Sequence, residues 1–515
     1  MHKRRCFFLA IALVGGLSAT TTTFADVKLP AIFSQHMVLQ GDAVVPVWGW
    51  ADPGEAVTVS IAGLTETVTA DTEGKWMVRL DKPTGREPLT LTVKGKNTLT
   101  VEDVLIGEVW LASGQSNMQM GVNGVTNAWQ EKMSAQFPKI RMFTVARRTA
   151  VTPQANCDGE WIVCNPETVG NFSATAYFFG RELYQTLNTP VGLINASWGG
   201  TAIEAWTSMS AQEGIKELAP VFQIWQHKTS VPYDEVKAQA QYERQMMLWR
   251  LNSDKAKAAG QKPPQKPYPP VAPRLQSNHP ANLFNGMIAP LIPYAIRGAI
   301  WYQGENNAHG EFARLYAMQL SLMIQDWRRR WNAGDFPFAW VQLPNFHQRT
   351  SDPGAPADWA VIRESMLRSL AVPNTGMAIG IDVGEADNIH PKDKQTIGLR
   401  LARWARAEVY GEKIAFSGPL LKRHKLGAGE VTLTFDHTEG GLVAKGGELK
   451  GFAVAGEDRK WVWAKARIEG NEVIVSSSEV KAPAAVRYAW ANNPDCNLFN
   501  GAGLPASPFR SDDWK

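Results

Sequence analysis

Residues 114–118, Gly-Gln-Ser-Asn-Met, place a serine where it can act as a nucleophile. The apolar run at residues 108–112 comes just before them and is typical of a buried strand. A strand that passes into a glycine-containing turn puts Ser116 at its carboxyl end, where open α/β sheets bind ligands. There the hydroxyl can attack an acyl carbon while the Ser116 N–H faces the oxyanion that develops. The alternative is a serine that only caps a helix.

A base for this serine is expected at His390. Residues 377–382 predict a strand, and His390 lies in the loop after it, just before Pro391, which suits the first turn of a helix. Asp387 precedes His390 by three residues in the same loop. In a turn this spacing lets the carboxylate accept the Nδ1–H, which leaves Nε2 to take a proton from a serine. The alternative is a polar loop in which Asp387 is only a cap.

Two more predicted strands end in groups that can stabilise an oxyanion. Residues 191–196 run into Ser-Trp-Gly-Gly-Thr at 197–201, and residues 298–302 run into a loop that begins at Gln303. Glycine N–H groups and a side-chain amide are donors of the type that an oxyanion hole uses. A tight turn and a loop that only binds substrate are the alternatives. Because the carboxyl ends of parallel strands share one sheet edge, we expect the four loops to meet.

The elements that carry these loops alternate between strand and helix over residues 104–415. This alternation predicts an α/β catalytic domain with a parallel sheet flanked by helices. The expected strands are 108–112, 191–196, 298–302, 338–343 and 377–382, and the expected helices are 174–187, 312–331, 359–370 and 392–410.

Residues 208–282 have the composition of an insertion within this domain. A helix is expected at 234–259, and the proline-rich stretch 261–270 is expected to be extended. We expect that stretch to be a surface connection or a wall of the active-site cleft. The alternative is a recognition ligand for a partner domain.

The chain is expected to be β-rich on both sides of the catalytic domain. Residues 26–103 predict a small β-sandwich, and residues 416–515 predict a second β region, sandwich-like or jelly-roll-like. The clearest alternating runs are 44–50, 57–61, 75–80, 89–93, 430–435, 461–464 and 472–475. The sequence alone does not indicate whether these two regions pack together.

Residues 1–25 have the three-part pattern of a secretory signal peptide. Lys3, Arg4 and Arg5 precede an apolar run that extends to about residue 17, and small residues lead to a cleavage site after Ala25. We therefore expect an exported protein, periplasmic or secreted. No later run reaches about 18 apolar residues, so no membrane association is expected after cleavage.

The charge balance does not favour nucleic acid as a partner. The chain has 53 Lys+Arg and 49 Asp+Glu, and three of the basic residues lie in residues 1–25, which leaves 50 basic and 49 acidic residues. Outside the signal, the cysteines are Cys157, Cys164 and Cys496. The short loop between the first two suits either a disulfide or two free thiols. Without a Cys-x-x-Cys pair, no zinc site is expected.

Four blocks of sequence together resemble the SGNH hydrolases. They are Gly-Gln-Ser-Asn-Met at 114–118, Ser-Trp-Gly-Gly-Thr at 197–201, Trp-Tyr-Gln-Gly-Glu at 301–305 and Asp-Asn-Ile-His-Pro at 387–391. More narrowly, they resemble the sialate O-acetylesterase-like carbohydrate esterases, in a branch with Gln-Gly-Glu in the third block. The resemblance covers nearly the whole chain after the signal, including residues 39–40 and 503–510.

The resemblance implies a role for each matching residue. Ser116 would be the nucleophile, His390 the general base and acid, and Asp387 the group that orients it. The oxyanion hole would consist of the Ser116 and Gly200 N–H groups and the Gln303 side chain. Where this branch has Gln303, the broader superfamily uses an asparagine.

That departure leaves further residues of the third block open. Asn306 and Asn307 are rival oxyanion donors, and Asn306 is also a candidate for binding substrate. Glu305 is a candidate for ordering the loop, for binding a sugar hydroxyl, or for replacing Asp387 as the partner of His390.

The reaction implied is removal of an acetyl group from a sugar hydroxyl, with no metal or organic cofactor. The substrate would be an acetylated oligosaccharide or polysaccharide, with plant hemicellulose (xyloglucan or xylan) preferred and sialic acid esters as the alternative. A non-catalytic glycan-binding protein and a glycosidase that uses Glu305 with Glu364 are the rival classes. The oligomeric state is not indicated by the sequence.

Overall fold

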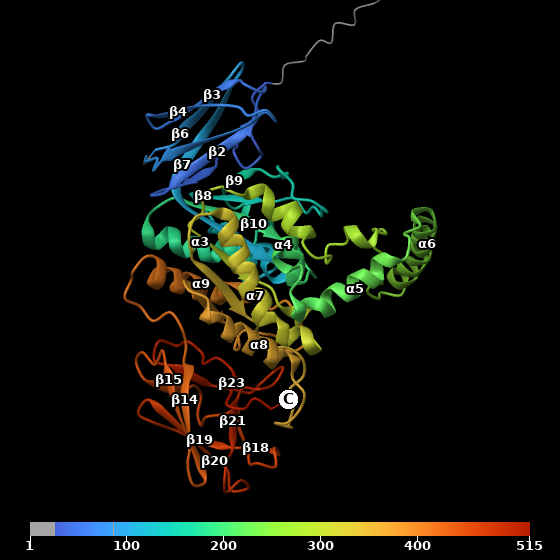
Figure 1. Ribbon diagram of the computed structural model, residues 1–515. Helices are drawn as coiled ribbons and strands as arrows, with labels where there is room; N and C mark the ends of the chain where they lie inside the picture. The colour runs from blue at the N-terminus through green and yellow to red at the C-terminus, as the bar shows by residue number, and fades with distance from the viewer. Residues whose placement is uncertain (1–25, 86, 515) are drawn as a thin grey trace, which may run out of the picture.

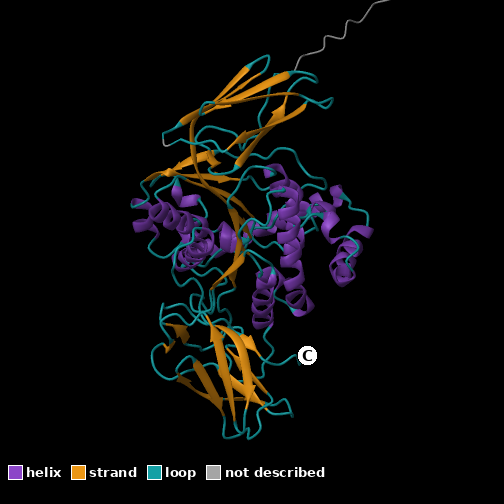
Figure 2. Ribbon diagram, turned by 60° about the vertical axis from the view of Figure 1, so that its left-hand side comes forward, coloured by secondary structure: helices purple, strands orange, loops and turns teal. Residues whose placement is uncertain are grey.

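A central α/β domain lies between two β domains in the computed structural model, which describes residues 26–85 and 87–514 (Figure 1). The N-terminal and C-terminal β domains are at opposite ends of the molecule in both views (Figure 2), so they do not form one accessory unit. The predicted signal peptide at residues 1–25 lies outside the described residues.

The core of the molecule is a parallel sheet of the order β13-β12-β11-β7-β10-β8, with β9 antiparallel at one edge. Every residue of β10, β11 and β12 is buried, because helices cover both faces of the sheet, and this explains their unbroken apolar runs. The strands are β7 (Thr98–Gly114), β8 (Phe137–Thr144), β9 (Trp161–Cys164), β10 (Val191–Ser197), β11 (Gly298–Tyr302), β12 (Phe338–Gln342) and β13 (Thr375–Ile379).

The covering helices form two pairs in contact, α3 with α9 and α7 with α8. The predicted helix 174–187 is confirmed, and most other predicted elements differ by one to three residues at an end. The predicted helix 392–410 is shorter, because α9 ends at Trp404 and the chain continues as a π-helical turn, Ala405–Val409. The bounds are α3 (Ala174–Leu187), α7 (Gly310–Trp331), α8 (Asp358–Arg368) and α9 (Lys394–Trp404), with short helices α1 (Ser116–Gln119) and α2 (Ala128–Met133).

The N-terminal β domain shares a strand with the catalytic domain. The first part of β7 pairs antiparallel with β6, and its last seven residues pair parallel with β10. The predicted boundary between residues 103 and 104 therefore falls inside one continuous strand, which carries the chain directly to Ser116. The other strands are β1 (Val38–Gln40), β2 (Val44–Trp50), β3 (Ala56–Ile61), β4 (Leu64–Thr69), β5 (Lys75–Asp81) and β6 (Leu89–Lys94).

The insertion projects from the body of the molecule as a helical arm only in α5 and α6 (Figure 1), whereas its α4 packs against α7. Its elements are α4 (Met209–Gln212), α5 (Ala219–Ser230) and α6 (Glu235–Ala258), and only Ser253 of α6 is buried. Asp234 caps α6 by accepting a hydrogen bond from the Lys237 N–H at 2.9 Å. The proline-rich stretch 261–270 has no regular hydrogen-bonded structure and leads back toward the cleft.

The C-terminal β domain has its own apolar core and is joined to the catalytic domain through α8. Arg363 is fully buried and donates to the carbonyl groups of Leu343 and Pro344 on one side and of Ala491 and Asn492 on the other. The strands are β14 (Leu420–Leu426), β15 (Glu430–Asp436), β16 (Leu442–Ala444), β17 (Phe452–Ala455), β18 (Trp461–Trp463), β19 (Lys465–Glu469), β20 (Glu472–Ser476), β21 (Ala485–Tyr488), β22 (Leu498–Asn500) and β23 (Phe509–Arg510).

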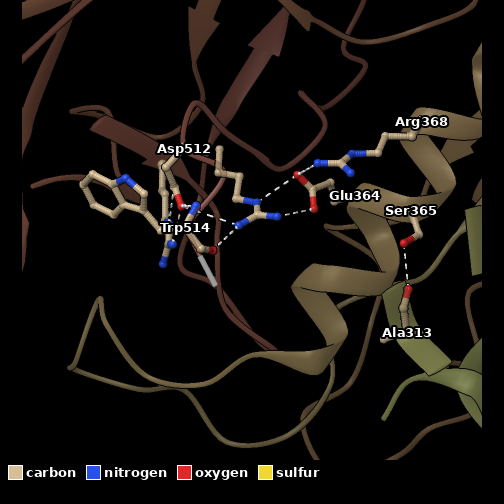
Figure 3. Close-up of polar contacts among 8 residues, drawn as sticks. Ala313, Glu364, Ser365, Arg368, Asp512 and Trp514 are labelled. Carbon is tan, nitrogen blue, oxygen red and sulfur yellow. Dashed lines mark hydrogen bonds and ion pairs between the residues drawn. The ribbon is translucent and has the colours of Figure 1, made fainter. Parts of the chain in front are cut away.

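A second polar contact at this interface centres on Glu364 of α8 (Figure 3). Its carboxylate accepts two hydrogen bonds from Arg510 of the C-terminal domain, at 2.9 and 3.0 Å, and one from Arg368 at 2.9 Å. The next residue of α8, Ser365, donates to the Ala313 carbonyl of α7 at 2.7 Å (Figure 3). The C-terminal domain is thus attached to the helix layer that supports the sheet.

Cys157 and Cys164 are buried free thiols in the structure, so the disulfide alternative is not realised there. Burial raises the pKa of each thiol to about 12. None of the described helices is long and apolar enough to cross a membrane.

Candidate active site

The serine and histidine of the first two predicted loops meet at the carboxyl edge of the sheet. β7 ends at Gly114, whose φ of +135° and whose approach to Tyr302 exclude a side chain, because a Cβ there would lie 2.2 Å from the Tyr302 carbonyl oxygen. The chain then turns, and Ser116 begins α1. The Nε2 atom of His390 lies 2.8 Å from the Ser116 Oγ, within hydrogen-bonding distance.

Both side chains open into a cleft of about 950 Å³. This volume is at the upper end of the roughly 300–1,000 Å³ that small-molecule sites usually have. The cleft is lined by Gln115, Ser116, Gln119, Met120, Arg147, Trp198, Gly199, Gly200, Tyr268, Ser277, Glu305, Asn306, Ile389 and His390. Tyr268 and Ser277 come from the insertion, so the expectation that its proline-rich part forms a wall of the cleft is met.

Two main-chain donors face the cleft beside the serine hydroxyl. Gly200 lies in the loop after β10 with a φ of +74°, is exposed, and has open space around it. The N–H groups of Ser116 and Gly200 make no hydrogen bond within residues 26–85 and 87–514, whereas the Gly199 N–H donates to Gln119 at 2.7 Å. Two unpaired N–H groups at this edge suit an oxyanion.

Gln303 is not in the cleft, which corrects the expectation that it is an oxyanion donor. Its side chain is completely buried below the loop, and its Nε2 atom donates to the Thr201 carbonyl at 3.0 Å and to the Asn307 Oδ1 at 2.8 Å. Its Oε1 accepts from the Tyr316 hydroxyl at 2.8 Å. Because both amide hydrogens are used, no donor remains for a substrate oxygen.

Asn306 is the amide of this loop that reaches the cleft. Its backbone N–H donates to Gln115 at 3.3 Å, and its Nδ2 makes only a long 3.4 Å contact with Asn278. Asn307, the other rival, is buried, donates to Glu204 at 3.1 Å, and accepts from the Ile203 N–H at 3.1 Å.

Asp387 lies in the same loop as His390, but no hydrogen bond joins the two among the described contacts. Asp387 is exposed and lies in a turn. In this turn the Asn388 N–H donates a hydrogen bond to the Glu385 carbonyl. Asn388 holds the main chain of His390 instead, accepting from its N–H at 3.1 Å and donating to its carbonyl at 2.9 Å. The expected contact between the Asp387 carboxylate and the His390 Nδ1 is therefore not formed in this structure.

The electrostatic setting of His390 favours a neutral imidazole. Partial burial lowers its pKa below the ordinary value of 6.5, and the nearby Lys394 ammonium lowers it further. A neutral ring can accept the Ser116 proton at Nε2 near neutral pH.

Glu305 contributes to the wall of the cleft, but neither of its carboxylate oxygens is free and exposed there. One oxygen accepts a short hydrogen bond from the Asn117 side-chain amide, and Oε2 is buried without a partner. Burial raises the pKa of Glu305. Glu364 does not line the cleft and is bound to Arg510 and Arg368, so the carboxylate pair of a glycosidase is not assembled.

Two buried polar residues near the site, Asn117 and Lys394, were not singled out from the sequence. Asn117 lies inside the first block, directly after the serine, and this position could have indicated a role at the site. Lys394 is four residues after His390, and the sequence gives no sign that this one lysine is buried. Within the described part of the chain, no three His, Cys, Asp or Glu side chains are grouped as a metal site would require.

Comparison with known proteins gives one consistent family. Residues 106–249 and 278–406 match the family described as carbohydrate esterases, sialic acid-specific acetylesterases. The chain is 32% identical to the sialate O-acetylesterase of Mus musculus over 94% of each chain, and 31% identical to that of Homo sapiens over 97% of each.

A solved structure supports the same relationship over the whole molecule. The chain is similar to a carbohydrate acetylesterase from Xanthomonas citri, with 37% identity and a TM-score of 0.80, across 95% of this chain and 100% of that one. The expected family resemblance and the α/β fold with additional β regions are confirmed. The chain belongs to the carbohydrate esterase family of the sialic acid-specific acetylesterases, and it is a carboxylic-ester hydrolase.

Proposed function

We propose that the protein removes acetyl groups from sugar hydroxyls, with Ser116 as nucleophile and His390 as general base and then general acid. The observation that carries this proposal is the 2.8 Å contact between the His390 Nε2 and the Ser116 Oγ at the floor of an open cleft. Ser116 attacks the acetyl carbonyl carbon as His390 takes its proton. His390 then protonates the departing sugar oxygen, and a water molecule, activated by the same imidazole, hydrolyses the acetyl-enzyme.

The oxyanion of each tetrahedral intermediate is bound by the N–H groups of Ser116 and Gly200 and by the Asn306 side chain. These groups are supported by their position in the cleft and by the absence of other partners for the two N–H groups within the described chain. Asp387 would join as the third member of a Ser-His-Asp triad only after its loop moves. The Ser116–His390 pair therefore carries the proposal alone.

The preferred substrate we propose is an acetylated hemicellulose oligosaccharide, of the xyloglucan or xylan type. The cleft has room for more than one sugar ring, and it is lined by two aromatic side chains, Trp198 and Tyr268, whose flat faces suit sugar rings. Tyr268 is 78% exposed, so its ring is open to a ligand.

A sialic acid ester is the second candidate, and a particular residue favours it. Arg147 lines the cleft, is exposed, and lies with its guanidinium 5.8 Å from the centre of the Trp198 ring. No carboxylate is bonded to Arg147 among the described ion pairs, so it is available to the carboxylate of an acidic sugar. The relatives from Mus musculus and Homo sapiens are sialate O-acetylesterases.

Acetate release from a matched panel tests both parts of the proposal. The panel contains acetylated xyloglucan and xylan oligosaccharides, O-acetylated sialic acid and an aryl acetate, each with wild-type protein and with Ser116→Ala. We expect Ser116→Ala to lose about 10⁶-fold in kcat on every substrate, as expected for a catalytic unit built on the serine. Unchanged hydrolysis by Ser116→Ala would overturn the mechanism.

Two further variants separate the substrates. Arg147→Gln should weaken hydrolysis of the sialic acid ester alone, and Tyr268→Ala should raise KM for the oligosaccharides while leaving the aryl acetate unaffected. Arg148→Gln, at an exposed neighbour outside the cleft lining, is the matched control. Faster turnover of sialic acid esters than of any hemicellulose fragment would refute the hemicellulose preference.

Export is a separate proposal that rests on the sequence of residues 1–25. Expression of the full chain should yield a mature protein that begins at Asp26. Sequencing the N-terminus of protein recovered from the periplasm or the medium tests this, and an intact Met1 would contradict it.

A further inference from the structure

Three polar side chains behind the serine have no role in the acyl chemistry described above. Asn117 is 1% exposed, Lys394 is fully buried, and the outer carboxylate oxygen of Glu305 is buried without a hydrogen-bond partner. Lys394 is also the first residue of α9, where the positive end of the helix dipole disfavours a cation. Burying a lysine and a glutamate in this way costs free energy, so their placement calls for an explanation.

The three side chains form one hydrogen-bonded group centred on Asn117. The Asn117 Nδ2 donates to Glu305 and to the Ile389 carbonyl, the latter at 2.9 Å. Its Oδ1 accepts from the Lys394 Nζ at 2.6 Å. The amide of Asn117 is therefore fully engaged, and its orientation is fixed by a cation on one side and a carboxylate on the other.

This group holds the chain on both sides of His390. Asn117 binds the carbonyl of Ile389, the residue before the histidine, and Lys394 donates to the carbonyl of Pro391, the residue after it, at 2.7 Å. Because Asn117 also follows Ser116 directly in the chain, the same amide links the segment that carries the nucleophile to the segment that carries the base.

We propose that Asn117, Glu305 and Lys394 are positioning residues that fix His390 against Ser116 through its main chain. This inference rests on the proposed function, since it concerns the same serine and histidine. None of the three touches the reacting atoms. They set the distance and angle between base and nucleophile, and the Lys394 charge also acts on the imidazole.

The electrostatics of the group are consistent with this arrangement. Burial lowers the pKa of Lys394 to about 7, and the facing carboxylates of Glu305, Glu385 and Asp393 act against that effect. As an ammonium, Lys394 lowers the pKa of His390. Removing the Lys394 charge should therefore let the pKa of His390 rise.

The test compares Lys394→Met and Glu305→Gln with the wild type in kcat, KM and the pH profile of kcat/KM on an aryl acetate. For Lys394→Met we expect about a 10²-fold loss in kcat, because misplacing a catalytic group by about 1 Å has that effect, with KM little changed. Glu305→Gln keeps an acceptor for Asn117 and should lose less. For Lys394→Met the acidic limb of the profile should move to higher pH.

Lys392→Met is the matched control, because it makes the same substitution at an exposed lysine two residues after His390. Its side chain makes no hydrogen bond in the described structure, so kcat and the acidic limb should equal those of the wild type. Thermal unfolding and circular dichroism of every variant show whether each is folded. If Lys394→Met does not fold, the loss in kcat of the isosteric Glu305→Gln decides the question.

An acidic limb that stays at the wild-type pH in folded Lys394→Met, or a wild-type kcat in folded Glu305→Gln, would overturn the positioning role, since a merely structural group lowers stability without changing either. Failure of the proposed function gives a different result. In that case Ser116→Ala keeps its activity. If only this inference fails, Ser116→Ala is inactive, and both positioning variants have the kcat and the pH profile of the wild type.

Discussion

Gln303 and Asn306 lie in one loop, but substituting them should have different effects on catalysis, because only Asn306 is placed to donate to the oxyanion. Asn306 lines the cleft, and its side chain makes only a 3.4 Å contact with Asn278, whereas Gln303 is buried and has no free donor. We therefore expect Asn306→Ala to lower kcat by about 10²–10³-fold, or about 2.7–4 kcal/mol of transition-state stabilisation, as for loss of one oxyanion donor. KM and the free energy of unfolding should change little.

Gln303→Ala should show the opposite pattern. It removes the partner of the Thr201 carbonyl and of the Asn307 Oδ1 and leaves a cavity next to the Tyr316 hydroxyl. The expected cost is on the order of 3 kcal/mol in the free energy of unfolding. At a temperature where the variant is folded, the loss in kcat should be smaller than that of Asn306→Ala.

The assay measures kcat and KM for an aryl acetate and for an acetylated oligosaccharide, with the free energy of unfolding taken from urea titrations of the same samples. The reasoning is refuted if folded Gln303→Ala loses 10²–10³-fold in kcat, about 2.7–4 kcal/mol, while Asn306→Ala is nearly normal. That result would mean that the Gln303 amide turns into the cleft when substrate binds.

Three further predictions follow from the same contacts. Asp387→Asn should keep kcat within a few-fold of the wild type, because Asp387 makes no hydrogen bond to His390. A loss in kcat near 10⁴-fold, as when a triad carboxylate is neutralised, would show that the loop rearranges to form the triad. The acidic limb of wild-type kcat/KM should lie below pH 6.5, because burial and Lys394 lower the pKa of His390 and the base acts when neutral; a limb above 6.5 would contradict this assignment. Glu364→Gln should lower the free energy of unfolding by about 2 kcal/mol in denaturant titrations, because it weakens the charged hydrogen bonds from Arg510. The same variant should leave kcat unchanged. A large loss in kcat would instead show that Glu364 takes part in the reaction.

The sequence predicted the meeting of Ser116 and His390 because both lie at the carboxyl ends of strands of one parallel sheet, and that edge is fixed by topology. It did not predict which side chain of a loop faces the cleft. Gln303 and Asn306 are three residues apart. Between them the chain turns at Gly304, with a φ of +147°, and enters the 3-10 turn Glu305–Asn307, so the first side chain is buried and the second lines the cleft.

Two other differences have equally local causes. The strand expected at residues 377–382 ends at Ile379, so the loop before His390 is longer and Asp387 lies at an exposed turn rather than against the ring. Lys394 resembles any lysine in the first turn of a helix, and its burial follows only from the packing of α9 against the sheet and from the carbonyl groups that it meets. Such contacts between distant segments have no signature in the spacing of residues.

The central claim is that Ser116 is the nucleophile activated by His390, and covalent labelling tests it most directly. The full chain is treated with a fluorophosphonate probe and digested, and the modified peptide is identified by mass spectrometry. We predict a single adduct on the peptide that contains Ser116, absent in Ser116→Ala and formed far more slowly in His390→Ala. An adduct at another serine, or equal labelling of Ser116→Ala, would contradict the account.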